Sequence, residues 1–416
     1  MERNQKKNLI ILACLGAAYF IAFIFPNAST LGSDNRQVYL HKDEYVIYPL
    51  VERMLEMEGS ASNIWGRFIN YGDFTYGYPY FFFSSLALLP LRLINGQEFF
   101  NQTPLNILVL RQAINVLPMV LIAGIFSYIQ TKFRSTWKSI FVFLFILTIP
   151  AVVRSNIHWW HPDSLMLLAI ALTFLFLDLD KQQLGKHFYL AAAACGLAAG
   201  IKLSGFFFVL AIPFYLLICR IRSTHSFKKI LLAGVGFVLV MTMTILLSNP
   251  ILFYEGPRQE ILARQAEKAE ELGSGYKQEE SLYFRTAPRY WRWTVHQWYG
   301  RPWMVDLLYA ALLFGSVWGD RKTSNQLITA WTVPLGIYLL WFVAPKPDHY
   351  LLPLLIPVYS AVLIPVPAIL EDTGKFSEWR KYLAYLRGAI YAGLISFQLY
   401  FHLSRSLAQY FQYIYL

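Results

Sequence analysis

Long apolar runs recur along this sequence, and they constrain its fold more than any other feature. Several approach the roughly 20 residues that an α-helix needs to cross a membrane; the first covers about residues 8–26 and the second about residues 106–130. Only 15% of the 416 residues are charged, whereas a soluble chain carries about 25%. The sequence therefore predicts an all-α polytopic membrane protein, with residues 1–416 forming one integral membrane domain.

The placement of basic residues predicts how the chain crosses the membrane. Lys6 and Lys7 precede the first span, and cytoplasmic loops are enriched in such residues. Further basic clusters fall at residues 132–138, 220–229 and 375–387. About eleven spans and a cytoplasmic N-terminus place every cluster on the cytoplasmic side. Two long loops with juxtamembrane helices, residues 27–105 and 251–301, then lie on the periplasmic, extracellular or lumenal face.

Residues 79–95 are a special case within the first long loop. They are apolar but contain Pro79, Pro90 and Arg92, and we interpret them as a re-entrant or interfacial helix. If they crossed the membrane, the agreement of the basic clusters with a cytoplasmic location would be lost. The net charge of +11 is explained by these cytoplasmic clusters and does not indicate a nucleic-acid partner.

Two adjacent carboxylates, Asp43 and Glu44, follow the first predicted span. They open a segment in which apolar residues recur at helical spacing, so the pattern predicts a helix. Acidic residues are common at helix N-termini, because they accept from free backbone N–H groups and complement the helix dipole. Alternatively, one carboxylate at the membrane boundary could act as a general base. The residues by themselves are compatible with both roles.

A second polar stretch runs from Arg154 to Asp163 and includes His158 and His161. Ionisable groups at a span boundary are costly and often functional. Two imidazoles and a carboxylate could bind a metal, but a zinc site needs three or four ligands in defined geometry, and the spacing here is weak evidence for one. The same side chains could instead face water in an interfacial loop, or form hydrogen bonds to a polar substrate.

Three isolated cations, Arg111, Lys202 and Lys346, lie at predicted outer ends of spans. Each alone is explained by contact with lipid phosphates at the membrane surface. Together they could bind the phosphate of a lipid-linked substrate, since arginine makes bidentate phosphate contacts and lysine supplies a point charge. Asp348 and His349 add an acid and an imidazole on the same side, although the prolines before them equally indicate a solvated turn.

Five motifs follow one another along most of the chain. They are Asp43-Glu44 with the helix after it, Leu110-Arg111-Gln112-Ala113, His161-Pro162-Asp163, the Gly196–Lys202 segment, and His349-Tyr350-Leu351-Leu352-Pro353. In their order and topology they resemble the GT-C membrane glycosyltransferases, in particular the dolichyl-phosphate-mannose protein mannosyltransferase-like superfamily (glycosyltransferase family 39), with which bacterial aminoarabinose transferases share the pattern.

The resemblance implies an inverting transferase in the membrane. It would move a sugar from a polyprenyl-phosphate donor to a hydroxyl acceptor on a lipid, glycan or protein. Asp43 would be the general base, and Glu44 would orient the site by pairing with Arg111. The leaving phosphate would be stabilised by Arg111, Lys202 and Lys346. The substrate pocket would be lined by Arg154, His158, His161, Asp163, Asp348 and His349.

Two departures from the family's pattern bear on substrates and cofactors. We expect no large outer domain of the kind that eukaryotic protein mannosyltransferases carry, and this expectation argues against a protein acceptor. No DxD motif follows the first span, so we predict no metal cofactor. The alternative function is a secondary transporter of a polar or lipid-linked solute. Transport favours charges near mid-span and broken helices in paired halves, whereas the charges here gather at span ends.

Overall fold

The computed structural model describes residues 3–32, 41–222, 225–274, 290–318, 321–365 and 378–414. Every regular element in these ranges is a helix, as the all-α class predicts. The N-terminal part contains α1 (Arg3–Ala22), α2 (Ile24–Ala28), η1 (Ser29–Gly32), α4 (Lys42–Met54), α5 (Ala61–Ile69), α6 (Tyr78–Asn95) and η2 (Gly96–Asn101).

The central part contains α7 (Thr103–Leu110), the π-helical η3 (Arg111–Val116), α8 (Leu117–Thr131), α9 (Thr136–Leu147), α10 (Pro150–His158), α11 (Asp163–Asp180), α12 (Lys186–Ile201), η4 (Leu203–Leu210), α13 (Ala211–Arg222) and α14 (Phe227–Ser248). The C-terminal part contains η5 (Pro250–Phe253), α15 (Glu255–Ser274), α16 (Trp291–Trp298), α17 (Pro302–Val317), α18 (Lys322–Ile337), the π-helical η9 (Tyr338–Phe342), α19 (Asp348–Tyr359), η10 (Ser360–Leu363) and α21 (Glu378–Ile414).

Several helical segments are long and apolar enough to cross a membrane. In the described part of the chain, four meet this criterion alone: Arg3–Ala28, Thr103–Thr131, Leu203–Arg222 and Phe227–Ser248. Helices α9 and α10 form a fifth only as a pair, bent by 56°. The bend precedes Pro150, whose ring and missing N–H interrupt a helix. The chain is thus an integral multi-pass membrane protein, and the figure of about eleven spans stays a prediction.

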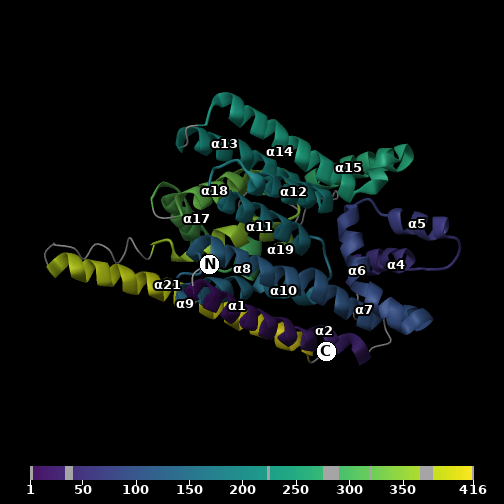
Figure 1. Cartoon of the computed structure of the whole chain (residues 1–416). Coiled ribbons are helices and arrows are strands. Elements are labelled where there is room, and N and C mark those ends of the chain that lie inside the picture. Colours follow the sequence, from purple (N-terminus) through teal and green to yellow (C-terminus); the bar gives the residue numbers. More distant parts are fainter. Residues whose placement is uncertain are drawn as a thin grey trace.

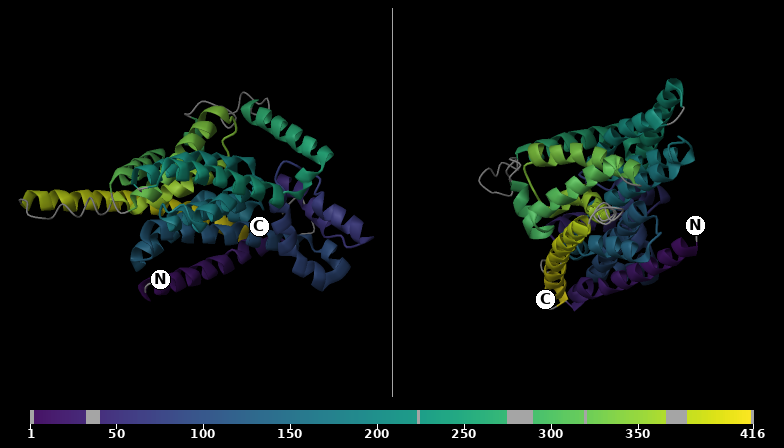
Figure 2. Two further views of the ribbon diagram at one scale, coloured as in Figure 1. Left: turned by 45° about the horizontal axis from the view of Figure 1, so that its top comes forward. Right: turned by 90° about the vertical axis from the view of Figure 1, so that its left-hand side faces the viewer.

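The central helices pack as a row. Helices α8, α11, α12 and α14 contact one another in that order, and Figure 1 shows them stacked side by side. Helices α4, α5 and α6 of the first long loop project together at one end of this row (Figure 1). The long helix α21 lies along α2 near its C-terminal end, where Tyr410 donates to the Ala22 carbonyl at 2.6 Å, and its other end extends beyond the bundle (Figure 2).

The 79–95 segment forms one continuous helix, α6. Its last turn is tied to α4, because the buried Arg92 donates through Nε to the Leu55 carbonyl at 3.1 Å. This contact keeps α6 with the other helices of the first long loop. The proposed re-entrant or interfacial course of α6 remains a prediction.

Polar contacts join the connecting turns at the opposite end of the row. Lys132 forms an ion pair with Asp178, and Gln182 donates to the Thr323 hydroxyl at 3.4 Å. The Gln182 carbonyl also lies 3.0 Å from His225 Nε2. We name this part of the molecule the basic end; it comprises residues 132–138, 178–189, 220–222, 225–229 and 321–323. It therefore gathers several basic clusters that the sequence places in separate loops.

Gly77 joins the first long loop to the end of α12. Its N–H donates to the Ile201 carbonyl at 2.9 Å, and a Cβ at this position would lie 1.6 Å from the Gly200 oxygen. The next residue, Tyr78, donates its N–H to the Asn249 side chain at 2.9 Å. Only glycine permits so close a backbone approach, so this contact fixes where α6 begins relative to Lys202.

We expect Gly77→Ala to lower the free energy of unfolding by about 1–3 kcal/mol, because the added methyl group must displace the α12 backbone. Gly66→Ala is the matched control, since Gly66 lies inside α5 with open space around its Cβ position, and alanine favours a helix there. Thermal unfolding in detergent would compare the two. Equal melting temperatures for Gly77→Ala and the unchanged protein would contradict this packing.

Candidate active site

A cavity of about 940 Å³, here named the main cavity, lies where the first long loop, the α10–α11 turn, η4, α15 and the start of α19 meet. Eight of the eleven site residues predicted from the sequence line it: Asp43, Arg154, His158, His161, Asp163, Lys202, Asp348 and His349. Glu44, Arg111 and Lys346 lie outside its lining. The structure therefore brings together residues that are up to about 300 positions apart in the sequence.

Asp43 stands in the first turn of α4 and points toward the main cavity. His41 caps this helix, because its Nδ1 accepts from the Asp43 N–H at 3.3 Å. The Asp43 side chain is 38% exposed, and its Oδ2 lies 3.9 Å from His41 Nδ1. Within the described residues no hydrogen bond engages this carboxylate, so it can accept one from a bound molecule.

Glu44 has a different environment although it is the next residue. Its side chain is fully buried and receives Arg111 Nε at 2.9 Å and Nη2 at 2.6 Å, one on each oxygen. The Trp160 N–H donates to the same carboxylate at 2.6 Å and the His41 N–H at 2.9 Å. These four bonds occupy the acceptor positions of a carboxylate. Glu44 thus joins α4 to η3 and to the α10–α11 turn.

The pairing determines where Arg111 lies. The sequence placed Arg111 among the phosphate-binding cations, but its guanidinium is 3% exposed and forms a bidentate contact with Glu44. Residue 111 also begins the π-helical segment η3, an irregularity that is frequent at functional positions. In this structure Arg111 links η3 to α4 through Glu44, and it does not face the main cavity.

Lys346 is likewise engaged by the protein backbone. Its ammonium donates to the Leu339 carbonyl at 2.8 Å and also to the Val343 carbonyl, at the C-terminal end of η9. Lysine is favourable there, because free carbonyls carry the negative end of the helix dipole. Burial lowers the pKa of Lys346 to about 8. Lys346 therefore fixes the segment before Asp348, and Lys202 is the only one of the three predicted phosphate-binding cations that lines the main cavity.

Lys202 lies at a break in the helix. Helix α12 ends at Ile201, and Lys202 adopts an extended backbone before η4 begins. Its ammonium lies 2.6 Å from Asp163 Oδ1 and 5.0 Å from the centre of the Tyr350 ring. Because the break turns this side chain into the main cavity, Lys202 can neutralise Asp163 and still meet an anion there.

His161 connects Asp163 to the first long loop. Its Nε2 lies 2.8 Å from the Tyr76 hydroxyl, and its Nδ1 lies 2.9 Å from Asp163 Oδ2 without hydrogen-bond geometry. Burial lowers the pKa of His161 to about 4 against the attraction of Asp163. Burial and the nearby Tyr350 and Asp163 raise the pKa of Tyr76 well above its ordinary value. Both rings are thus neutral near pH 7.

The start of α19 contributes Asp348 and His349 to the lining of the main cavity. Asp348 Oδ2 lies 3.3 Å from Arg154 Nε, and the Arg154 guanidinium stacks 4.5 Å from the Trp298 ring. The rings of His161 and His349 are 5.0 Å apart. His158 lies against His41, with ring centres 5.0 Å apart, and its Nδ1 is 2.5 Å from the Tyr413 hydroxyl of α21.

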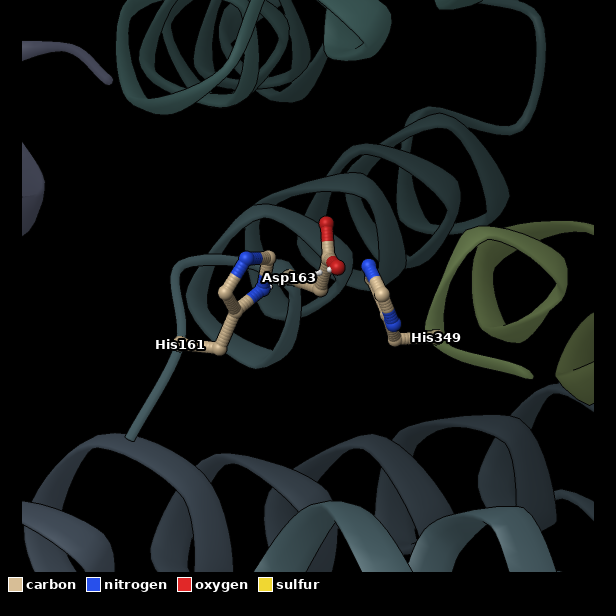
Figure 3. A group of neighbouring side chains, drawn as sticks. All are labelled: His161, Asp163 and His349. Atoms are coloured by element: carbon tan, nitrogen blue, oxygen red, sulfur yellow. Dashed lines mark ion pairs between the residues drawn. The ribbon is translucent and has the colours of Figure 1, made fainter. Parts of the chain in front are cut away.

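Three of these side chains could hold a divalent cation. Figure 3 shows Asp163 between the imidazoles of His161 and His349, and one ligand atom from each lies within 4.8 Å of the others. Two imidazoles and one carboxylate are a ligand set that suits zinc. The Lys202 ammonium competes with such an ion, however, because it already supplies a positive charge to the same carboxylate.

Helix α15 contributes residues that the sequence did not identify. Arg264, Gln265 and Lys268 line the main cavity, and Gln265 donates to the Phe74 carbonyl at 2.8 Å. The Leu272 carbonyl accepts from the Ala344 N–H at 2.8 Å, so α15 is tied to both sides of the main cavity. The sequence of α15 is that of a solvated amphipathic helix; Arg264 and Lys268, one turn apart on one face, were its only indication of a site.

The comparisons with known proteins concern the fold of the chain. The family model for dolichyl-phosphate-mannose-protein mannosyltransferase matches residues 100–247. Comparison with curated protein sequences finds no significant match. Among solved structures, the oligosaccharyltransferase AglB from Archaeoglobus fulgidus, in complex with an inhibitory peptide and a dolichol-phosphate, is similar over 95% of this chain, with a TM-score of 0.57 and 13% identity.

ArnT from Cupriavidus metallidurans is similar in two states. In the apo state 97% of this chain matches with a TM-score of 0.53 and 13% identity, and with undecaprenyl phosphate bound the TM-score is 0.51 at 12% identity. This chain has the GT-C fold. The resemblance found in the sequence and the predicted fold class are thereby confirmed. The chain spans 56% of the AglB chain, and 75% and 76% of the two ArnT chains.

The buried Glu44–Arg111 pair gives a stability prediction for this GT-C fold. We expect Glu44→Gln to lower the free energy of unfolding by about 3–5 kcal/mol, because it leaves the Arg111 charge buried without its counter-ion. Asp43 is the neighbouring residue and is partly exposed, so Asp43→Asn should change the free energy of unfolding by less than about 1 kcal/mol. Thermal unfolding of both variants in the same detergent checks this, and similar losses for the two would refute the assigned difference.

Proposed function

We propose that this protein is a membrane glycosyltransferase. It transfers a sugar from a polyprenyl-phosphate donor to a hydroxyl acceptor, with inversion at the anomeric carbon and Asp43 as the general base. The GT-C fold is shared with AglB and ArnT, whose structures contain dolichol-phosphate and undecaprenyl phosphate. Those ligands support a polyprenyl-phosphate donor for this chain.

Asp43 is assigned as the general base because its carboxylate is free to accept a proton. Three other carboxylates that line the main cavity face cations: Asp163 pairs with Lys202, Asp348 with Arg154 and Glu271 with Lys268. Asp73 accepts from the Thr75 N–H at 2.8 Å. Asp43 alone among the described carboxylates of the main cavity has neither a lysine or arginine partner nor a hydrogen bond. A carboxylate in this state can accept the proton of an acceptor hydroxyl.

The proposed reaction is a single displacement. The acceptor oxygen forms a bond to the anomeric carbon while its proton passes to Asp43, and the bond from that carbon to the phosphate oxygen breaks on the opposite face. Polyprenyl phosphate leaves with the bonding electron pair. Lys202 and Arg154 line the main cavity, beside Asp163 and Asp348 respectively, and are the cations assigned to stabilise its charge.

The membrane orientation belongs to the same proposal. The basic end of the bundle lies opposite the first long loop and α15, as the positive-inside rule requires for a cytoplasmic face. Asn8 of α1 donates to the Phe133 carbonyl at 2.7 Å, which places the start of the chain at the basic end. The N-terminus is then cytoplasmic, and the main cavity opens on the periplasmic, extracellular or lumenal side.

We expect Asp43→Asn to reduce sugar transfer by about 10²–10⁴-fold, because the amide cannot accept the proton. The assay would incubate purified protein with a panel of polyprenyl-phosphate sugars and follow released polyprenyl phosphate and glycosylated product by mass spectrometry. Glu56→Gln is the matched control, since Glu56 lies near the end of α4, exposed and 3.6 Å from Arg67. Full transfer by Asp43→Asn would remove Asp43 from the mechanism. Solute uptake into vesicles with no transfer from any donor would favour the transporter alternative.

We further propose that the reaction needs no divalent metal, because the Lys202 ammonium supplies the charge that a metal would bring to Asp163. Transfer should therefore persist after EDTA treatment and dialysis, with less than a twofold change. Lys202→Gln should lower transfer by about 10²-fold or more, in line with losing one charge-stabilising donor. Loss of activity with EDTA that Mn²⁺ or Zn²⁺ restores would instead assign a metal to His161, Asp163 and His349.

A further inference from the structure

A second cavity lies at the basic end, far from the groups described above. It has a volume of about 300 Å³ and is situated between the start of α12 and the start of α14. Leu184 and Ala233 form its buried floor, and the exposed side chains of Tyr189 and Leu232 form its walls. Lys228 and Lys229 stand at its rim. We name it the basic-end cavity.

The packing of α12 against α14 explains the cavity at this end. Near the main cavity, Gly196 and Gly200 of α12 let the two helices touch: a Cβ on Gly196 would lie 2.5 Å from the Met241 carbonyl. Such small residues permit close helix contact in a membrane. At the basic end the Tyr189 ring stands against Gly236 of α14 instead. Beyond this ring the small Ala233 side chain leaves the space unfilled.

The loop that forms the floor is held rigidly. Both Asp180 carboxylate oxygens accept backbone N–H groups at 2.9 Å, from Leu184 and Gly185, and the Tyr215 hydroxyl donates to the same carboxylate at 2.7 Å. Leu184 has a φ of 56°, which a residue with a side chain adopts only when its surroundings impose it. The floor is therefore preorganised and does not depend on a ligand to form.

The charged side chains at the rim of the basic-end cavity are all positive. Lys228 and Lys229 are exposed, and the lining described for the basic-end cavity contains no acidic side chain. Lys229 Nζ lies 3.2 Å from His225 Nδ1, which keeps the ammonium near the rim. A ligand here thus meets two positive charges above an apolar floor, an arrangement that suits a phosphate group joined to a hydrocarbon.

The neighbouring surface belongs to the membrane. Phe227–Ser248 is one of the candidate spans, and only 22% of its most apolar window is buried inside the protein. Its exposed side chains near the basic-end cavity include Leu231, Leu232 and Val235. Leu232 is shared by this lipid-facing surface and by the wall of the basic-end cavity. An acyl chain lying along α14 therefore leads directly to the two lysines.

We propose that the basic-end cavity binds an anionic phospholipid from the leaflet at this end of the protein. Its phosphate and glycerol headgroup occupies the cavity beside Lys228 and Lys229, and its acyl chains lie along the apolar face of α14. Basic pockets between membrane helices bind acidic headgroups in this manner. The site is separate from the proposed transfer reaction and does not depend on it.

Titration of the purified full-length protein with dioleoyl phosphatidylglycerol, followed by native mass spectrometry, tests the proposal. Dioleoyl phosphatidylcholine is the comparison lipid. We expect the double variant K228Q/K229Q to bind phosphatidylglycerol about 30-fold more weakly, since each lysine near a charged headgroup contributes a factor of about five and the two factors multiply. K228R/K229R should bind as the unchanged protein does, because it keeps both charges.

K6Q/K7Q is the matched control, since it removes the same charge from exposed residues of α1 at the same end. It should leave binding unchanged, and thermal unfolding should be alike for all variants. Equal binding of the two lipids, or equal loss in K6Q/K7Q and K228Q/K229Q, would overturn the proposal. If millimolar inorganic phosphate displaced phosphatidylglycerol, the basic-end cavity would be a site for free phosphate, and the lipid proposal would be wrong.

Discussion

The ion pair between Glu44 and Arg111 is the interaction on which the site depends. It is fully buried and joins α4 to η3, while the Trp160 N–H adds the α10–α11 turn to the same carboxylate. Burying two charges is costly unless they are paired and their remaining hydrogen-bonding positions are filled, and here four donors reach one carboxylate. The pair therefore fixes the orientation of the first turn of α4, and with it the direction in which Asp43 points.

A second set of constraints places the groups opposite Asp43. The Gly77 contact fixes the end of α12, so that Lys202 emerges at the helix break. Lys346 holds the segment before α19 through backbone carbonyls. Tyr299 adds to this hold, since its hydroxyl donates to the Asp348 carbonyl at 2.6 Å. The residues that face the main cavity are thus oriented by others that do not face it.

The sequence predicted the helical membrane fold and eight of the polar residues that line the main cavity, because apolar length and clustered polar residues are local signals. The resemblance also implied the pairing of Glu44 with Arg111 across 67 positions, and the structure contains that pair. The sequence did not show that this pairing turns Arg111 away from the main cavity, which Lys202 lines. Successive residues of a helix point about 100° apart, which is why Asp43 and Glu44 meet different surroundings. The part played by α15 depended on tertiary contacts that its solvated pattern does not encode.

Five carboxylates and four lysine or arginine side chains line the main cavity, so its net charge is close to zero. Such a site exerts little long-range attraction on an anion in bulk solution. A polyprenyl-phosphate donor, however, is confined to the membrane plane by its tail and arrives by lateral diffusion. For the proposed enzyme, the rate of donor capture then follows the surface density of donor in the bilayer, and it responds only weakly to ionic strength.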